Sequence, residues 1–217
     1  MIVDLNLQNK KVIVIGGGKE SLKRIKSLLN QKCEINVISG RTSPEINKLA
    51  KSKKIKLVKQ DIKDMSFISK YNPSLIIATT DDKKLNQKII NSAKKRKIMV
   101  YSSDSPEDSD FSNPAIIDFE NTIQIAIFTG GKSPAMSKRL KEESEKILKK
   151  IITKKDIDHI KLQKIAREEA KKKIATQMER KEYLKRILAD KEIDQLIKDG
   201  QLKKAEKRAI TILRDWK

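Results

Sequence analysis

Short apolar runs alternate with amphipathic stretches over residues 1–101 of the chain. The apolar runs are rich in isoleucine, valine and leucine, which is typical of parallel strands buried on both faces. They are Val12–Ile15, Glu34–Ile38, Lys56–Val58, Leu75–Ala78 and Ile98–Tyr101. Helical periodicity follows the first, second and fourth runs, at 22–29, 44–52 and 85–95. The alternation predicts an α/β fold with a Rossmann-type, doubly wound parallel sheet.

The pattern changes after Asp104. A stretch rich in Ser, Pro and Asp, closed by Asn113-Pro114, is typical of a loop. Two further strands are expected at Ala115–Phe119 and Thr122–Phe128, joined by a tight turn at Glu120-Asn121. These strands lie outside the alternating pattern and therefore begin a different part of the molecule.

The rest of the chain, from Ser133 onward, follows a helical pattern, with breaks near Thr153 and at Asp199-Gly200. Ser133 and Pro134 supply an N-cap and a first-turn proline for the first of these helices. The predicted divisions are 1–113 for the Rossmann-type domain, 114–150 for a small middle segment and 151–217 for a C-terminal helical domain.

Charge is the strongest compositional signal, since 50 Lys and Arg against 29 Asp and Glu give a net charge of +21. Such a field attracts anions. We do not expect nucleic acid as the partner, because aromatic residues make up only 4% of the chain and no RNA-binding or zinc-finger motif is present. The basic excess is spread along the whole chain. A generally lysine-rich composition therefore explains this excess as well as a functional role of the charge does.

The cysteine and histidine counts narrow the possible chemistry. Cys33 is the only cysteine, which excludes an intramolecular disulfide and a CxxC metal site and fits a reducing cytoplasm. His159 is the only histidine and lies in a charged helical stretch, so we interpret it as a surface residue and expect no metal site. No apolar run approaches the roughly 20 residues that span a bilayer, and the N-terminus lacks a signal-peptide pattern. We expect a cytoplasmic protein without membrane contact.

A glycine turn follows the first buried strand and opens the first helix, which is where dinucleotide enzymes bind the pyrophosphate. It consists of Gly16, Gly17 and Gly18, followed by Lys19 and Glu20. Gly16 allows the tight turn, and Gly18 lets the backbone approach the phosphates. Ser21, which replaces the third glycine of the usual fingerprint, is small enough for close helix packing. A glycine turn without a ligand remains the alternative.

The end of the second strand carries Gly40 and Arg41 where NAD enzymes place a ribose-binding acid. Arg41 suits the 2′-phosphate of NADP, but stacking on adenine or exposure to solvent explains it equally well. Thr80 and Asp81 follow the fourth strand, at the edge where open α/β sheets bind ligands. Either they contact the cofactor, or Asp81 or Asp82 caps the next helix.

Asp104 follows the fifth strand at the same edge of the sheet. A carboxylate there, beside a bound dinucleotide, is placed to act as a base. Aspartate before a turn is also ordinary, so position alone leaves the catalytic and structural interpretations open.

Several blocks of the chain resemble the precorrin-2 dehydrogenase/ferrochelatase module of siroheme synthase. They occur in family order within residues 1–145, and the C-terminal residues match only in being helical. The blocks are Val14–Gly18, Ala78–Asp82 with Asn86-Gln87, Ser103–Pro106, Phe111–Asp118 and Thr129–Pro134.

The resemblance implies NAD-dependent oxidation of precorrin-2 to sirohydrochlorin, and in some members insertion of ferrous iron. It implies a homodimer with its interface in the middle segment, 114–150. Asp104 matches an aspartate implicated in catalysis, and Ser133 and Asn113 become expected substrate contacts. NAD is the expected cofactor, with NADP left open. We expect dehydrogenase activity alone, because no dedicated iron ligand is evident.

A protein of another class remains the alternative: a nucleotide-sensing or nucleic-acid-binding protein that uses a Rossmann-type domain as a regulator and its basic helices for binding. Salt-dependent binding to generic duplexes, without affinity for NAD, would favour that alternative. A chelatase without oxidation would instead insert metal into sirohydrochlorin and fail to reduce NAD.

Overall fold

The computed structural model describes residues 2–216 of the chain. The chain divides into two compact units, Met1–Asn113 and Pro114–Lys217, which are described separately. In the described part, no helix is both long and apolar enough to cross a membrane.

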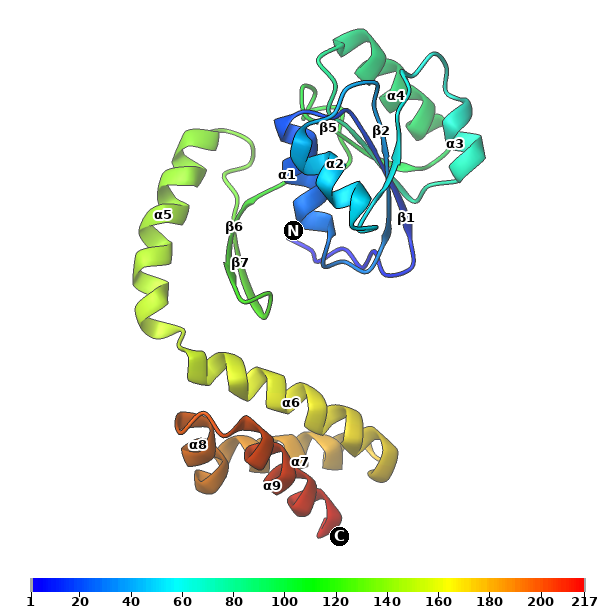
Figure 1. Ribbon diagram of the computed structural model, residues 1–217. Coiled ribbons are helices and arrows are strands. Elements are labelled where there is room, and N and C mark those ends of the chain that lie inside the picture. Colours follow the sequence, from blue (N-terminus) through cyan, green and yellow to red (C-terminus); the bar gives the residue numbers. More distant parts are fainter. Residues whose placement is uncertain (1, 217) are drawn as a thin grey trace. The chain divides into compact units, whose positions relative to one another are not determined.

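The first unit is built on five parallel strands in the order β3-β2-β1-β4-β5 (Figure 1). The strands are β1 (Lys11–Ile15), β2 (Glu34–Ile38), β3 (Lys56–Val58), β4 (Leu75–Ala78) and β5 (Met99–Ser102). β1 is central and pairs with β2 on one side and β4 on the other. This arrangement confirms the predicted doubly wound parallel sheet.

Alternate residues of β1 fill two separate cores, because successive side chains of a strand point to opposite faces. Val12 and Val14 belong to one core, and Ile13 and Ile15 to the other. All four side chains are completely or almost completely buried. A strand buried on both faces favours apolar residues at successive positions, and such a run can be recognised in the sequence.

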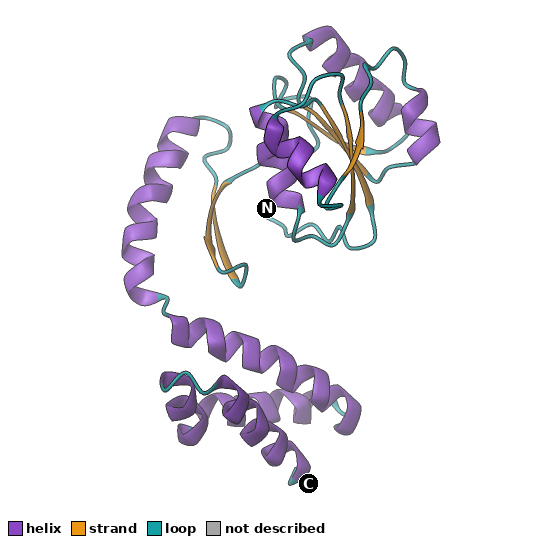
Figure 2. Ribbon diagram, viewed as in Figure 1, coloured by secondary structure: helices purple, strands orange, loops and turns teal. Residues whose placement is uncertain are grey.

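Helices cover both faces of the sheet (Figure 2). They are α1 (Lys19–Leu28), α2 (Pro44–Lys51), α3 (Ser66–Tyr71) and α4 (Lys83–Lys95). The first two pack against the core of Val12 and Val14, and the last two against the core of Ile13 and Ile15. Helix α3 was not predicted: it has six residues and ends at Asn72, whose φ of 45° is left-handed. It is too short to show a helical period.

The second unit begins with a two-stranded antiparallel ribbon of β6 (Ala115–Phe119) and β7 (Ile123–Ile127). The turn has positive φ at Glu120 and Asn121, and the Thr122 N–H donates to the carbonyl of Phe119 at 2.9 Å. The predicted strands and tight turn are therefore present.

Five helices follow the ribbon. They are α5 (Pro134–Ile151), α6 (Lys154–Lys173), α7 (Gln177–Ala189), α8 (Lys191–Lys198) and α9 (Leu202–Arg214). The predicted breaks at Thr153 and Asp199-Gly200 are present, and two more occur at Thr176 and Asp190. Thr176 caps the start of α7, and Asp190 both ends α7 and caps α8. The side chain of each accepts from the backbone N–H group three residues later. Polar residues inside a charged stretch concealed these breaks.

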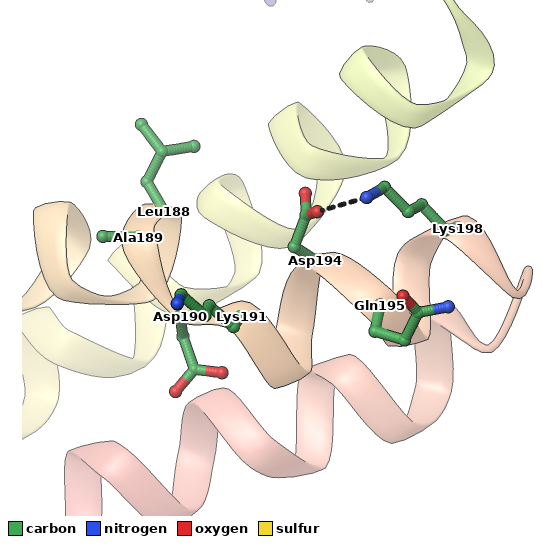
Figure 3. A pocket seen from close by; sticks show the side chains of 7 residues that line it. All are labelled: Leu188, Ala189, Asp190, Lys191, Asp194, Gln195 and Lys198. Carbon is green, nitrogen blue, oxygen red and sulfur yellow. Dashed lines mark ion pairs between the residues drawn. The ribbon is translucent and has the colours of Figure 1, made fainter.

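The interpretation of His159 as a surface residue is wrong, because its side chain is buried and its Nε2 lies 3.2 Å from Asp194 Oδ1. Asp194 also pairs with Lys155 at 2.6 Å and with Lys198 at 3.0 Å. Figure 3 shows the Asp194–Lys198 pair among the side chains that line a pocket. The volume of this pocket is about 400 Å³. Hydrogen bonds from Lys155 and Lys198 hold the pKa of Asp194 well below its usual range.

Replacement of Asp194 by Asn should make the helical unit less sensitive to acid. A carboxylate with a lowered folded-state pKa stabilises the fold fully above about pH 4 and loses that effect as pH falls. The free energy of unfolding should therefore be lower for Asp194→Asn at pH 7 and should fall less between pH 5 and 3 than in the wild type. Urea titrations followed by the fluorescence of Trp216, which packs in this unit, measure it.

Asp215→Asn is the matched control, because Asp215 is an exposed aspartate of the same unit. It should keep the wild-type pH dependence. If Asp194→Asn also kept it, the ion pairs of Asp194 would contribute nothing to stability.

Candidate functional site

The glycine turn brings three backbone segments very close together. Gly16 has φ of +118°, and a Cβ there would lie 2.6 Å from the carbonyl oxygen of Thr79. A Cβ on Gly17 would lie 2.0 Å from the carbonyl oxygen of Arg41. Gly18 differs, since nothing lies within 4 Å of its Cβ position. Packing therefore accounts for Gly16 and Gly17, while the space at Gly18 is open to a ligand.

Gly18 is also the N-cap of α1, and no side chain caps this helix. The N–H groups of a first helical turn have no partners within the helix, and together with the helix dipole they favour an anion. An open glycine before an uncapped helix fits a pyrophosphate, so the residues present fit a dinucleotide. Lys19, next in the chain, is exposed at the same helix end.

The side chain of Glu20 is engaged in an ion pair within the protein and is not free to contact a ligand. It pairs with Arg24, a largely buried residue that also donates to the hydroxyl of Tyr101 at 2.8 Å. The Arg24 guanidinium lies 4.7 Å from the centre of the Tyr101 ring. Burial raises the pKa of Tyr101, whose side chain also hydrogen-bonds to Asn113. Glu20 can therefore serve a cofactor through its backbone N–H.

A second set of contacts joins the turn to the end of β4. Ser21 is fully buried and its Oγ lies 2.8 Å from Thr79 Oγ1, which donates to the carbonyl of Ile15 at 2.9 Å. The small residue in place of the third glycine thus links α1 to β4.

Asp104 is held by a hydrogen-bond network that the sequence did not reveal. Its Oδ1 accepts from Asn86 Nδ2 at 3.0 Å and from Ser102 Oγ at 2.5 Å. Asn86 is fully buried, donates to the carbonyl of Thr80 at 2.9 Å and accepts from Thr80 Oγ1 at 2.7 Å. One amide therefore orients Thr80 and Asp104 at the ends of two neighbouring strands. Within the described residues, Asp104 Oδ2 has no hydrogen-bond partner.

The other predicted residues at this edge fall into two groups. Asp82, not Asp81, caps α4, accepting from the Leu85 N–H at 3.0 Å, and Asp81 is exposed. Gly40 and Arg41 are exposed in the loop after β2. That loop is tied to the glycine turn, because the Ser43 N–H donates to the carbonyl of Gly17 at 2.9 Å.

Ser133 lies in the second unit, where it is the N-cap of α5 and accepts from the Met136 N–H at 3.2 Å. In the described part of the chain, no three His, Cys, Asp or Glu side chains gather as metal ligands.

Comparison with known proteins gives the family. A family model described as "putative NAD(P)-binding" matches residues 3–115. Precorrin-2 dehydrogenase of Bacillus subtilis is 30% identical over 144 residues, which are 66% of this chain and 86% of that protein. The chain belongs to the precorrin-2 dehydrogenase family.

Longer relatives of the family are siroheme synthases. Siroheme synthase 3 of Aeromonas hydrophila is 27% identical over 209 residues, which are 96% of this chain and 43% of that protein. Siroheme synthase of Buchnera aphidicola is 33% identical over 144 residues, 66% of this chain and 30% of that protein. The chain thus spans less than half the length of these relatives.

A solved structure, "SirC, precorrin-2 dehydrogenase", superposes with a TM-score of 0.70 at 22% sequence identity. The match covers 97% of this chain and 99% of that one. This likeness confirms the fold of a parallel sheet followed by helices.

Gly17 and Gly18 of this family member should respond differently to substitution. Gly18→Leu should unfold at the wild-type temperature, because its side chain enters open space, yet it should weaken NAD binding about 10- to 100-fold by keeping the phosphates from the helix N–H groups. Gly17→Ala should lower the melting temperature, since its Cβ meets the backbone of Arg41. Calorimetric titration with NAD and thermal unfolding measure both effects. Unchanged NAD affinity in Gly18→Leu would show that the turn binds no pyrophosphate.

Proposed function

We propose that this chain oxidises precorrin-2 to sirohydrochlorin with NAD, as a step of siroheme biosynthesis. The observation that carries the proposal is the position of Asp104: a carboxylate with one oriented and one unpartnered oxygen stands at the sheet edge that also carries the uncapped glycine turn. Membership of the precorrin-2 dehydrogenase family supports the choice of substrate.

The glycine turn would bind the cofactor through backbone groups. The N–H groups that follow Gly18 would face the pyrophosphate, with Lys19 adding positive charge. Thr80 and Asp81 would border the nicotinamide half, and Gly40 and Arg41 the adenosine half, as expected at a topological switch point. When bound, NAD supplies the hydride acceptor.

Asp104 would take the proton that leaves the substrate as it is oxidised. Asn86 and Ser102 hold Oδ1, which fixes the carboxylate plane and directs Oδ2 away from these donors. A base fixed in this way needs no rotation before it acts. Asn113 and Ser133 are proposed substrate contacts, and ferrous-ion insertion is not part of the proposal.

Charge would assist the binding of a polycarboxylate such as precorrin-2. The net charge of +21 steers anions toward the protein. The helical unit also has a groove of about 680 Å³ that is lined by five cationic side chains and no carboxylate. They are Arg167, Lys171, Arg180, Lys181 and Lys185.

That groove is also the observation that favours a second candidate function, the binding of nucleic acid. A nucleic-acid-binding protein would retain generic duplexes at low salt, lose them steeply as salt rises and show no affinity for NAD. A dehydrogenase would bind NAD and reduce it when precorrin-2 is added.

We also propose that the protein acts in the cytoplasm, because a chain with a single cysteine suits a reducing compartment.

We further propose that the chain forms a homodimer through residues 114–150. No residue of α5 is buried, and four of its apolar side chains are exposed along one stripe: Met136, Leu140, Ile147 and Ile151. Both outer edges of the β6-β7 ribbon lack a paired strand in the described chain. An exposed apolar stripe is typical of an interface, and an unpaired strand edge can pair with another chain.

Introducing charge into the α5 stripe should separate the dimer. Ile147 and Ile151 are 61% and 65% exposed, so a double change to Glu leaves the core of the subunit intact and places charge in the interface. Light scattering at micromolar concentration should give a dimer mass for the wild type and a monomer mass for the double variant. Met178→Glu, at a side chain 73% exposed on α7, should leave the dimer unchanged. A monomer mass for the wild type would contradict the proposal.

Replacement of Asp104 by Asn should abolish most NAD reduction while NAD binding survives. The amide keeps the size of the side chain but removes the base, which typically lowers a rate by about 10² to 10⁴. The assay is absorbance of the reduced nicotinamide during incubation with precorrin-2, together with an NAD titration. Asp108→Asn, the same change in the same loop, should retain activity. Turnover near the wild-type rate in Asp104→Asn would move the base to another group.

A further inference from the structure

We propose that Asp61 binds the 2′- and 3′-hydroxyls of the adenosine ribose and makes the site selective for NAD over NADP. The inference rests on the proposed use of a dinucleotide and adds a specificity-determining residue to it. In dinucleotide-binding sheets this task belongs to an acid at the end of the second strand. Here that position has no acid, and the carboxylate of Asp61, from the loop that follows the neighbouring strand β3, lies beside it.

The geometry at Gly40 carries the inference. Strand β3 ends at Val58, and a tight turn, in which the Gln60 N–H donates to the carbonyl of Val58 at 3.1 Å, directs the chain back across the end of β2. A Cβ built on Gly40 would lie 2.1 Å from Asp61 Oδ1 and 2.8 Å from its Cγ. The Asp61 carboxylate therefore occupies the place where a side chain of residue 40 would begin.

Asp61 also lies on the correct side of the glycine turn. The loop that contains Gly40 touches that turn twice, at the Ser43 to Gly17 hydrogen bond and at the close approach of Gly17 to Arg41. A pyrophosphate at Gly18 would thus have its adenosine half directed toward this loop. Asp61 is within reach of that half because β2 and β3 are adjacent parallel strands that end at the same edge.

The carboxylate is available for a ligand. Asp61 is exposed, and no hydrogen bond or ion pair engages its side chain within residues 2–216. Asp64, three residues later, instead accepts from the Ser66 N–H at 2.8 Å. An ionised carboxylate is an acceptor with two oxygens, which suits two neighbouring hydroxyl donors. A 2′-phosphate would remove one donor and bring like charges together, so Asp61 disfavours NADP even with Arg41 in the same loop.

The test compares NAD and NADP binding to the full chain by calorimetric titration. The wild type should prefer NAD at least tenfold. Asp61→Asn should weaken NAD binding about 10- to 100-fold, the range expected for hydrogen bonds to a charged group, and should raise NADP affinity. Gly40→Ala should also weaken NAD binding, because its Cβ displaces the carboxylate without removing its charge. Asp4→Asn, at an exposed aspartate in the segment that precedes β1, should change neither affinity.

The outcomes separate this inference from the proposed function. If the wild type bound neither dinucleotide, the proposed dehydrogenase function would fail and this inference with it. If the wild type bound NAD but Asp61→Asn kept the same preference, only the role of Asp61 would fail. A wild type that preferred NADP would overturn the inference and would indicate that Arg41 binds the 2′-phosphate of the adenosine half.

Discussion

The candidate site depends on a close approach of backbone segments at Gly16 and Gly17, where no side chain would fit. A Cβ on Gly16 would clash with the carbonyl oxygen of Thr79, and a Cβ on Gly17 with the carbonyl oxygen of Arg41. These two contacts join the ends of β1, β2 and β4 into one edge. With that edge fixed, α1 begins at Gly18 without a cap and the loop after β2 stands beside the turn. The candidate anion site and the proposed adenosine side thus both depend on the same close approach.

Asn86 extends this edge to β5. A buried amide must satisfy both its donors and its acceptor, and here the partners are the Thr80 backbone, the Thr80 hydroxyl and the carboxylate of Asp104. Its orientation is determined, because exchanging oxygen and nitrogen would turn a carbonyl oxygen toward the carboxylate. The candidate base is therefore positioned by a residue that a ligand need not touch.

The sequence predicted those parts of the fold that leave a local pattern. Strands buried on both faces, such as Val12–Ile15, consist mainly of apolar residues, and Ser133-Pro134 is a local signal for a helix start. Pairings distant in sequence leave no such signal, as with Asn86 and Asp104, Arg24 and Tyr101, and Gly40 and Asp61. The prediction for His159 was wrong because its neighbours in the sequence are charged. The buried face of α6 to which His159 belongs continues with small and apolar residues from Leu162, three positions later, and this pattern was not recognised.

Among the described residues, the hydrophobic clusters of the first unit draw on none beyond Phe111, and those of the second unit use none before Ile117. Each buried side chain of these clusters is therefore constrained by packing partners of its own unit. Over evolutionary time, a nucleotide-binding sheet of this kind can keep its buried sequence while the ribbon and helices diverge, or the reverse.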